Sequence, residues 1–171
     1  VKTFPETDAV IASRMLLADE AIANEDYDTA MRHLSVVSEI FPNTPSAAQA
    51  LLRSARIHME RENYGQADED YSKILGVKAW RDLWPEALFG RGRIAEALDK
   101  PAQAATYYER IYVLYGYYKD WVARAYLARA RLLNEMGPVH RRKAVETLRA
   151  MLSREDLEGR EELEEARELL D

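Results

Sequence analysis

The sequence predicts an all-α protein, an α-α superhelix of about four helix-turn-helix repeats followed by a C-terminal capping helix. Three observations predict this fold. Apolar residues recur at the three- and four-residue spacing of amphipathic helices, and no segment has the alternation of a strand. Small residues recur at a fixed interval, since Ala30, Ala67 and Ala104 are 37 residues apart. Self-similarity with a period of this length is typical of repeat arrays, in which each unit buries its apolar face against its neighbours.

The second repeat shows the pattern most clearly. A first amphipathic helix is predicted over about residues 45–61, a tight turn over residues 62–65, and a second helix over about residues 66–75. Ala55 in the first helix and Ala67 in the second are predicted to lie where the two helices approach each other closely.

The other boundaries are predicted from turn residues, prolines and residues that accept backbone hydrogen bonds at helix starts. Residues 1–8 are predicted to form an irregular lead, with Pro5 in a first turn and Thr7 or Asp8 capping the first helix. The remaining predicted caps, stops and turns are Thr44 before Pro45, Asp82, Asp120 and Ser153 as caps, Gly76 and Gly116 as stops, and residues 25–28, 41–43, 77–83 and 137–140 as turns or connectors.

These residues resemble the tetratricopeptide repeat. The pattern of that family has small residues at positions 8 and 20, Tyr near position 17, an aromatic at 24, a small or apolar residue at 27 and Pro at 32. The matching residues are Ala18, Tyr27, Ala30, Leu34, Val37 and Pro42 in the first repeat, Ala55, Tyr64, Ala67, Tyr71 and Ile74 in the second, Gly92, Ala104, Tyr108 and Ile111 in the third, and Ala130, Ala144 and Leu148 in the fourth. Two features depart from the pattern: no Trp stands at position 4, and the period exceeds the usual ~34 residues.

The resemblance covers about residues 10–152 and implies one repeat domain over residues 1–171. The implied repeats are at about 11–44, 45–80, 82–118 and 120–153, with a capping helix at 154–171. The phrase FPNTPSAAQALL, residues 41–52, is also similar to bacterial cell-envelope members of the family, such as the Tol-Pal coordinator and outer-membrane assembly lipoproteins. That similarity implies a location in the bacterial periplasm or cell envelope, whereas the residues by themselves leave the localisation open.

No catalytic, metal or cofactor site is predicted. The chain has no cysteine, and His33, His58 and His140 fall in different repeats without the spacing of metal ligands. No strand-loop-helix pattern supports a phosphate-binding glycine loop. We therefore expect a protein that is not an enzyme, because an all-helical enzyme would need a cleft with convergent titratable groups.

Composition limits the partners. The formal net charge is −6, and residues 154–171, with nine acidic residues and three arginines, carry all of it. An acidic chain lacks the basic patch that nucleic-acid binding requires. The acidic tail is either a solvated helix face or a docking surface for a basic partner. No apolar run approaches the ~18 residues of a membrane span, so we expect no membrane insertion, and the sequence does not indicate a small-molecule ligand.

What remains is recognition of a protein or peptide. The resemblance implies that positions 2, 5, 9, 12 and 13 of each first helix face a concave groove. The partner-binding residues expected there are an apolar row, Met15, Leu52, Phe89 and Leu127, and an arginine row, Arg56, Arg93 and Arg131. The expected function is a protein-interaction scaffold that binds a peptide with an apolar anchor and flanking acidic groups. Alternatively, each arginine pairs with a nearby glutamate on its own helix, namely Glu60, Glu96 or Glu135.

A cluster of aromatic residues in the third and fourth repeats leaves a second function open. Seven tyrosines and Trp121 lie between residues 107 and 126. Tyr108 is the core aromatic of its repeat, and Tyr112 and Tyr115 follow at helical spacing, which favours packing between repeats. The alternative is an aromatic platform that binds a glycan.

Overall fold

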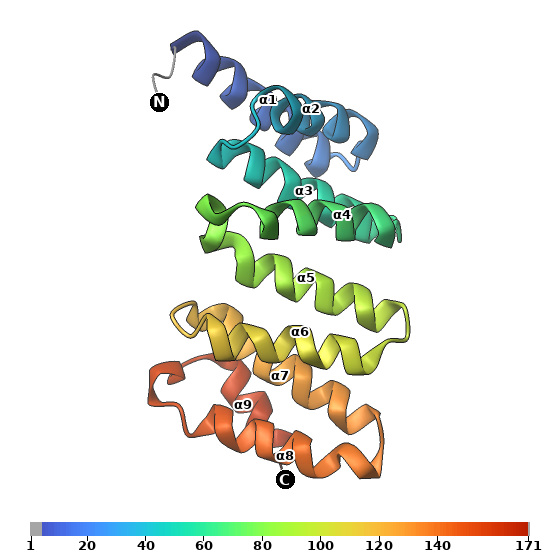
Figure 1. Cartoon of the computed structure of the whole chain (residues 1–171), viewed down its shortest axis with the longest axis vertical. Coiled ribbons are helices and arrows are strands. Elements are labelled where there is room, and N and C mark those ends of the chain that lie inside the picture. Colours follow the sequence, from blue (N-terminus) through green and yellow to red (C-terminus); the bar gives the residue numbers. More distant parts are fainter. Residues whose placement is uncertain (1–4, 171) are drawn as a thin grey trace. The chain divides into compact units, whose positions relative to one another are not determined.

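The computed structural model describes residues 5–170 and contains helices of two kinds. Within that range there are nine α-helices, two short 3₁₀ helices and no strand, which confirms the predicted all-α class. The elements are α1 Pro5–Ala23, α2 Tyr27–Ile40, α3 Pro45–Glu60, α4 Tyr64–Gly76, η1 Lys78–Leu83, α5 Trp84–Ala97, α6 Pro101–Leu114, α7 Lys119–Glu135, α8 Pro138–Leu152, η2 Glu155–Leu157 and α9 Glu161–Glu168 (Figure 1).

The chain divides into two compact units, Val1–Trp84 and Pro85–Asp171, which are described one at a time. In unit 1, α1 packs on α2 and α3 on α4, and α2 also packs on α3. In unit 2, α6 packs on α7 and α7 on α8, while α9 lies against both α7 and α8 (Figure 1). The pairs α1–α2, α3–α4 and α7–α8 thus form helical hairpins, and α5 contacts α6 through Gly92 and Tyr108. A single domain over the whole chain stays a prediction.

The turn inside each of the first three repeats has the same geometry. Glu25, Glu62 and Asp99, each 37 residues apart, have positive φ angles of 58°, 57° and 54°. In the second repeat the backbone N–H of Asn63 then donates to the carbonyl of His58 at 2.8 Å, the six-to-one bond of a Schellman motif. The corresponding bonds occur in the first and third repeats. This motif satisfies carbonyl groups at the helix end and turns the chain sharply into the second helix.

The small residues of the repeat lie in the core, as predicted. Ala30, Ala67 and Ala104 have no exposed surface. Gly92 in α5 is the tightest position: a Cβ atom there would lie 2.4 Å from Cε1 of Tyr108 in α6. Tyr108 is itself fully buried, and its hydroxyl donates to Glu96 Oε1 at 2.7 Å. The aromatic side chain of the second helix therefore occupies the space that the missing side chain of the first helix leaves.

Several predicted helix starts are wrong. α1 begins at Pro5, so Thr7 and Asp8 lie inside the helix and cap nothing, because proline is well suited to a first helical position. The rest of the predicted lead, residues 1–4, lies outside the described residues. Asp82 lies within η1, which continues directly into α5, and Asp120 is the second residue of α7, after Tyr118. The Thr44 cap is confirmed, since its hydroxyl accepts from the N–H of Ala47 at 3.0 Å.

The C-terminal segment is also not the single helix predicted over residues 154–171. Ser153 ends α8 and does not cap a new helix. The chain then forms η2 and turns at Gly159, whose φ is +82°, before α9. The segment nevertheless covers an apolar surface, because Leu157 and Leu163 are buried in the same cluster as Met151 of α8. The other buried members of this cluster are Val122, Ala123, Tyr126, Leu127, Ala130, Leu148 and Ala166.

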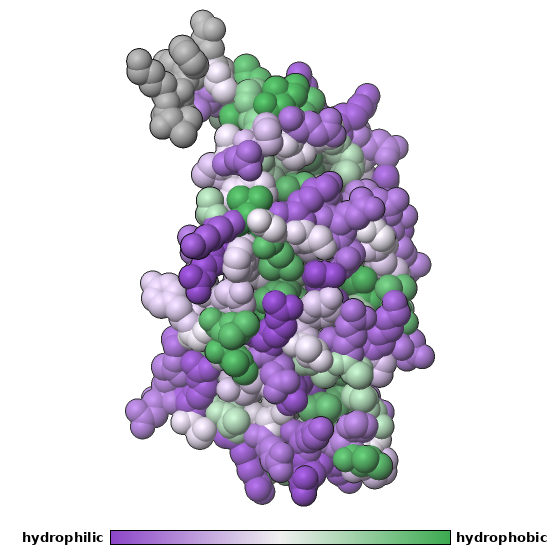
Figure 2. Space-filling view, viewed as in Figure 1, coloured by the Kyte–Doolittle hydropathy of each residue, from purple (hydrophilic) through white to green (hydrophobic). Residues whose placement is uncertain are grey.

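The face of the molecule that Figure 2 shows is mostly polar. Polar residues cover much of the face in Figure 2, and apolar residues gather there in separate patches. The most exposed large apolar side chains described are Val139, Tyr117 and Leu16, at 87%, 85% and 70%. None of the helices in the described part of the chain is both long and apolar enough to cross a membrane.

We predict that Gly92→Ala destabilises unit 2. The new methyl group would overlap the fully buried ring of Tyr108, and overpacking of this kind costs about 1–3 kcal/mol. Gly65→Ala is the matched control, because a Cβ atom at Gly65 meets nothing within 4 Å and alanine favours a helix over glycine. Urea unfolding should give a lower midpoint for Gly92→Ala and an equal or higher one for Gly65→Ala. Equal midpoints for Gly92→Ala and the parent would contradict the close crossing of α5 and α6.

We also predict that deletion of residues 154–171 causes self-association. The deletion removes Leu157, Leu163 and Ala166 from the cluster and exposes Leu148 and Met151 to water. An uncovered apolar end of a repeat array associates with other apolar surfaces. Light scattering coupled to size-exclusion chromatography should show oligomers or aggregates. A truncated chain that stays monomeric, with an unchanged melting temperature, would show that the segment is not a cap.

Candidate functional site

A pocket of unit 2 brings together four of the seven residues predicted to bind a partner. It has a volume of about 310 Å³ and lies between α5 and α7. Phe89 and Arg93 come from α5, and Leu127 and Arg131 from α7. The other lining residues are Glu96, Arg124, Ala128, Leu132 and Glu135.

The periodicity of the helix explains why α7 presents this set. Arg124, Leu127, Arg131 and Glu135 correspond to positions 2, 5, 9 and 13 of the fourth repeat. Residues separated by three or four positions lie above one another on one helix face. All four line the pocket, so the pattern of the repeat and the observed geometry agree at α7.

Aromatic packing holds Phe89 at the wall of the pocket. Its ring centroid lies 5.1 Å from that of Tyr108 and 5.5 Å from that of Trp121, with tilted planes in both pairs. Such contacts immobilise the ring. Phe89 remains partly exposed, so it offers a preformed apolar surface beside the arginines. Leu127, at 5% exposure, contributes to the wall but has little surface of its own to offer.

The arginines of the pocket are paired with carboxylates. Arg93 Nε lies 3.6 Å from Glu96 Oε2, which is the same-helix pairing considered from the sequence. Arg131 pairs instead with Glu165 of α9, so the pairing with Glu135 is wrong. Arg124 Nε lies 3.5 Å from Glu162 Oε1, also in α9. The acidic tail thus supplies carboxylates to the arginines of α7.

All three arginines remain accessible despite these ion pairs. The exposed fractions of the side chains of Arg93, Arg124 and Arg131 are 61%, 52% and 51%. Ion pairs at this exposure are weak, at about 0.2–1 kcal/mol. The guanidinium groups are therefore able to exchange one carboxylate for another at small cost.

The remaining predicted residues lie in unit 1, at two different cavities. Leu52 and Arg56 line a cavity of about 510 Å³ with Asp19, and Arg56 has an interaction partner of its own. Asp19 is held by Arg53, whose Nε lies 2.7 Å from Asp19 Oδ1. Met15 lines a separate cavity of about 600 Å³. A continuous groove through all four repeats would span both units, and it stays a prediction.

The aromatic cluster is used mainly for packing. Tyr108 has no exposed surface and Tyr115 only 9%. The rings of Tyr112 and Tyr126 are stacked, with centroids 3.8 Å apart and planes 9° from parallel. Burial raises the pKa of Tyr112 to about 12. Tyr117, at 85% exposure, stands out from the cluster, and these burials favour the packing interpretation over a glycan platform.

Sequence reasoning missed two components of the site. Arg124 occupies position 2, one of the positions expected to face the groove, so the repeat pattern contained a signal for it. The role of α9 had no such signal, because the pairing of Glu162 and Glu165 with α7 joins residues that lie 38 and 34 positions apart in the chain. As for metal chemistry, no group of three His, Asp or Glu side chains suited to a metal ion occurs among the described residues.

Comparisons with known proteins agree with the architecture. Residues 86–116, which span most of α5 and all of α6, match the family model of the tetratricopeptide repeat. The crystal structure of MamA protein is similar to the chain with a TM-score of 0.64 and 22% sequence identity, over 93% of this chain and 81% of that chain. No curated protein matches the chain in sequence. The chain therefore has the all-α fold of a tetratricopeptide-type solenoid.

Proposed function

We propose that the chain is a non-catalytic protein-interaction module, and that its unit 2 pocket binds a peptide with an apolar anchor flanked by acidic groups. One observation carries this proposal: the pocket between α5 and α7 combines an apolar wall with three accessible arginines. Arg124 and Arg131 already accommodate carboxylates of α9. The tetratricopeptide-type fold supports a protein partner, because helical repeat arrays commonly present extended binding surfaces.

The chemistry of the pocket favours carboxylates over other groups. A guanidinium group offers a planar fork of donors that matches a carboxylate in geometry and charge. Arg93, Arg124 and Arg131 outnumber Glu96 and Glu135 in the lining. The surrounding apolar surface of Phe89 gives an anchor position, and aromatic residues and arginine are the side chains that most often dominate binding energy.

The chain itself supplies a guide to the ligand. α9 places Glu162 and Glu165 three residues apart, so the two carboxylates point to the same side and reach Arg124 and Arg131. A partner with similarly spaced acidic residues would compete with Glu162 and Glu165 for Arg124 and Arg131. A further acidic residue of the partner would pair with Arg93. The bacterial cell-envelope location expected from residues 41–52 belongs to this proposal as the setting in which such a partner would be sought.

We predict that an acidic peptide binds the pocket in a salt-dependent manner. The probe is fluorescein-labelled Glu-Glu-Leu-Glu-Glu-Leu-amide, with the corresponding Lys-Lys-Leu-Lys-Lys-Leu peptide as the charge control, and fluorescence anisotropy is the measurement. The acidic peptide should bind and the basic peptide should not. Binding should weaken as salt rises, because charges at a rim are screened over ~8–10 Å at physiological ionic strength.

Variants of the lining separate the contributions. Arg93→Gln and Arg131→Gln should each weaken binding by up to about fivefold, since ion pairs at this exposure contribute ~0.2–1 kcal/mol, and should flatten the salt dependence. Phe89→Ala should weaken binding at every salt concentration, provided circular dichroism shows an intact fold. Arg142→Gln, at an exposed arginine of α8 paired with Glu146, is the matched control. If Arg93→Gln, Arg131→Gln and Phe89→Ala all bind the acidic peptide as tightly as the parent and the control do, this pocket is not the binding site.

A further inference from the structure

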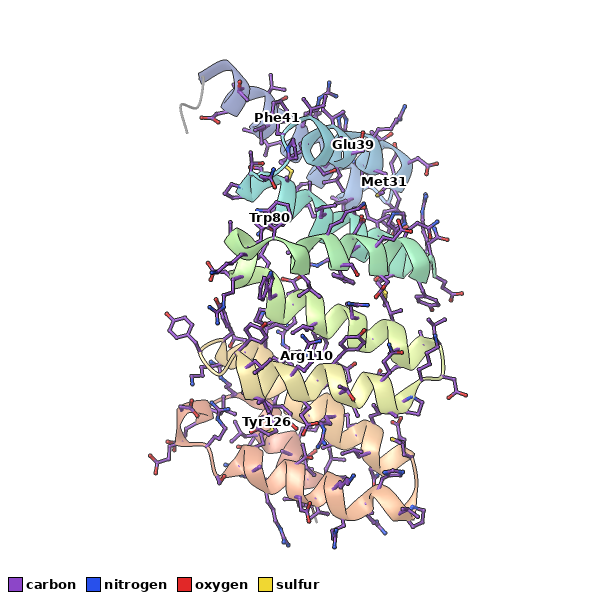
Figure 3. The ribbon with its side chains drawn as sticks, in the orientation of Figure 1. Met31, Glu39, Phe41, Trp80, Arg110 and Tyr126 are labelled. Carbon is purple, nitrogen blue, oxygen red and sulfur yellow. The ribbon has the colours of Figure 1, made fainter. Side chains whose placement is uncertain are left out.

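Unit 1 contains a cavity that the proposed function does not use. It has a volume of about 590 Å³ and lies among α2, α3, α4 and η1, which is a volume typical of ligand sites. Its walls come largely from α2 and α4, the second helices of the first two repeats. It is therefore distinct from the first-helix faces on which the partner-binding residues were predicted. Figure 3 marks Glu39 and Met31 on α2 and Trp80 in η1, three of its lining residues.

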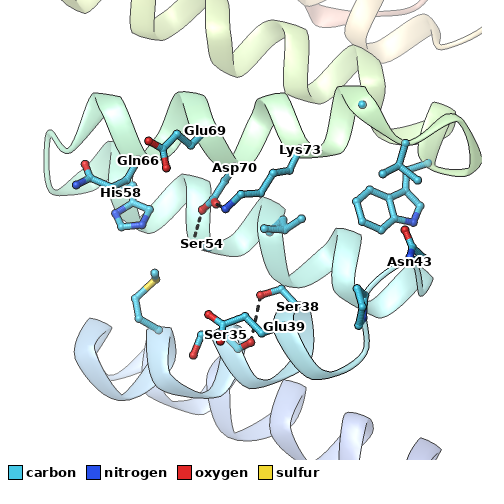
Figure 4. A pocket seen from close by; sticks show the side chains of 16 residues that line it. Ser35, Ser38, Glu39, Asn43, Ser54, His58, Gln66, Glu69, Asp70 and Lys73 are labelled. Atoms are coloured by element: carbon cyan, nitrogen blue, oxygen red, sulfur yellow. Dashed lines mark hydrogen bonds and ion pairs between the residues drawn. The ribbon is translucent and has the colours of Figure 1, made fainter.

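The cavity is elongated along α4. Gln66, near the start of that helix, and Gly76, at its end, both line it. Ten helical steps correspond to ~15 Å, which an extended chain covers with about four or five residues. Figure 4 shows polar side chains on both long walls, with Ser35 and Glu39 on α2 and with Glu69 and Lys73 on α4. The shape suits an extended peptide segment.

Two buried nitrogen atoms of the lining lack hydrogen-bond partners. Among the residues that the structure describes, three buried side-chain polar atoms have no partner, and two of them, His58 Nδ1 and Trp80 Nε1, belong to this cavity. Trp80 is only 7% exposed, and its indole N–H is a donor without an acceptor. A buried polar group without a partner costs about 1–3 kcal/mol. Both nitrogen atoms lie behind the surface of the cavity, so a ligand that contacts the Trp80 side chain changes the surroundings of the indole without reaching its nitrogen.

The charge of the cavity indicates the ligand. Glu39, Glu69 and Asp70 supply three carboxylates to the lining, and Lys73 supplies one ammonium group. That ammonium is already bound, since Lys73 Nζ lies 3.2 Å from Asp70 Oδ1. Asp70 also accepts from the hydroxyl of the buried Ser54 at 2.5 Å. Asp70 is therefore satisfied within the wall, and the exposed carboxylates of Glu39 and Glu69 at the rim remain for a cation.

We propose that this cavity binds an extended, basic segment of a partner protein. The segment lies beside Trp80, which lines the cavity. Its arginine or lysine side chains pair with Glu39 and Glu69 on the two walls. The apolar side chains of Leu51 and Val77, which also line the cavity, contact the aliphatic parts of the basic side chains. The two units then have opposite preferences, since the unit 2 pocket favours acidic ligands.

The indole N–H of Trp80 is a direct reporter for this proposal. The chain has three tryptophans, so a ¹⁵N-labelled sample gives three indole resonances, and Trp80→Phe assigns one of them. The probe is acetyl-Ala-Arg-Ala-Arg-Ala-amide, added to the full chain. The Trp80 resonance should move in a saturable manner, while that of Trp121, in unit 2, stays in place. A Trp80 resonance that does not move would overturn the proposal.

Charge variants test the two walls. Glu39→Gln and Glu69→Gln should each weaken binding of the arginine peptide at least about threefold, and the double variant at least about tenfold. Glu20→Gln, at an exposed residue of α1 that does not line the cavity, is the matched control and should bind as the parent does. Equal affinities for the double variant and the parent would refute the pairing.

Two further probes define the ligand class. Free argininamide should bind much more weakly than the peptide, because it cannot span the cavity. Acetyl-Ala-Glu-Ala-Glu-Ala-amide should not bind here, because its charge is repelled. If either probe binds as tightly as the arginine peptide, a basic peptide is the wrong ligand class. Arg131→Gln should leave binding of the arginine peptide unchanged, which separates this test from that of the unit 2 pocket.

Discussion

The close crossing of two helices within each repeat is the constraint on which the rest of the structure depends. At the third repeat the ring of Tyr108 occupies the space beside Gly92, where a Cβ atom would overlap it at 2.4 Å. Ala18 and Ala55, at the positions of the first two repeats that correspond to Gly92, have no exposed surface. Small residues allow the helix axes to approach, and the large side chain from the partner helix then fills the gap at close to crystal density. A larger side chain at these positions would separate the helices and alter every face they present.

Both candidate sites follow from this crossing. Once the small residues face inward, the positions three, four and seven residues away are turned to other faces of the same helix. On α7 one such face collects Arg124, Leu127 and Arg131 in a pocket. The unit 1 cavity lies between α2 and α4, the second helices of the first two repeats, with Glu39 and Glu69 on opposite walls. The sites differ in charge because different helix faces line them.

The distribution of charge connects stability with recognition. The acidic residues that give the chain its net charge of −6 lie in residues 154–171. Two of them, Glu162 and Glu165, form ion pairs with arginines of α7. The same segment buries Leu157 and Leu163 against α7 and α8, so its apolar residues pack in the core while its charged residues form ion pairs. The guanidinium and ammonium groups of Arg154 and Lys119 also hold the pKa of Asp156 well below its usual range, because both stabilise its charged form.

The sequence by itself determined the helical hairpins and the buried small residues, because these depend on local periodicity and on a repeat of fixed length. It also located Thr44 as a helix cap, since that interaction lies within three residues of the chain. Only the tertiary structure decided that Arg131 pairs with Glu165 and that the indole N–H of Trp80 is buried without a partner. These features join segments that are distant in the chain or depend on how several helices enclose a space. No local pattern of residues encodes such proximity.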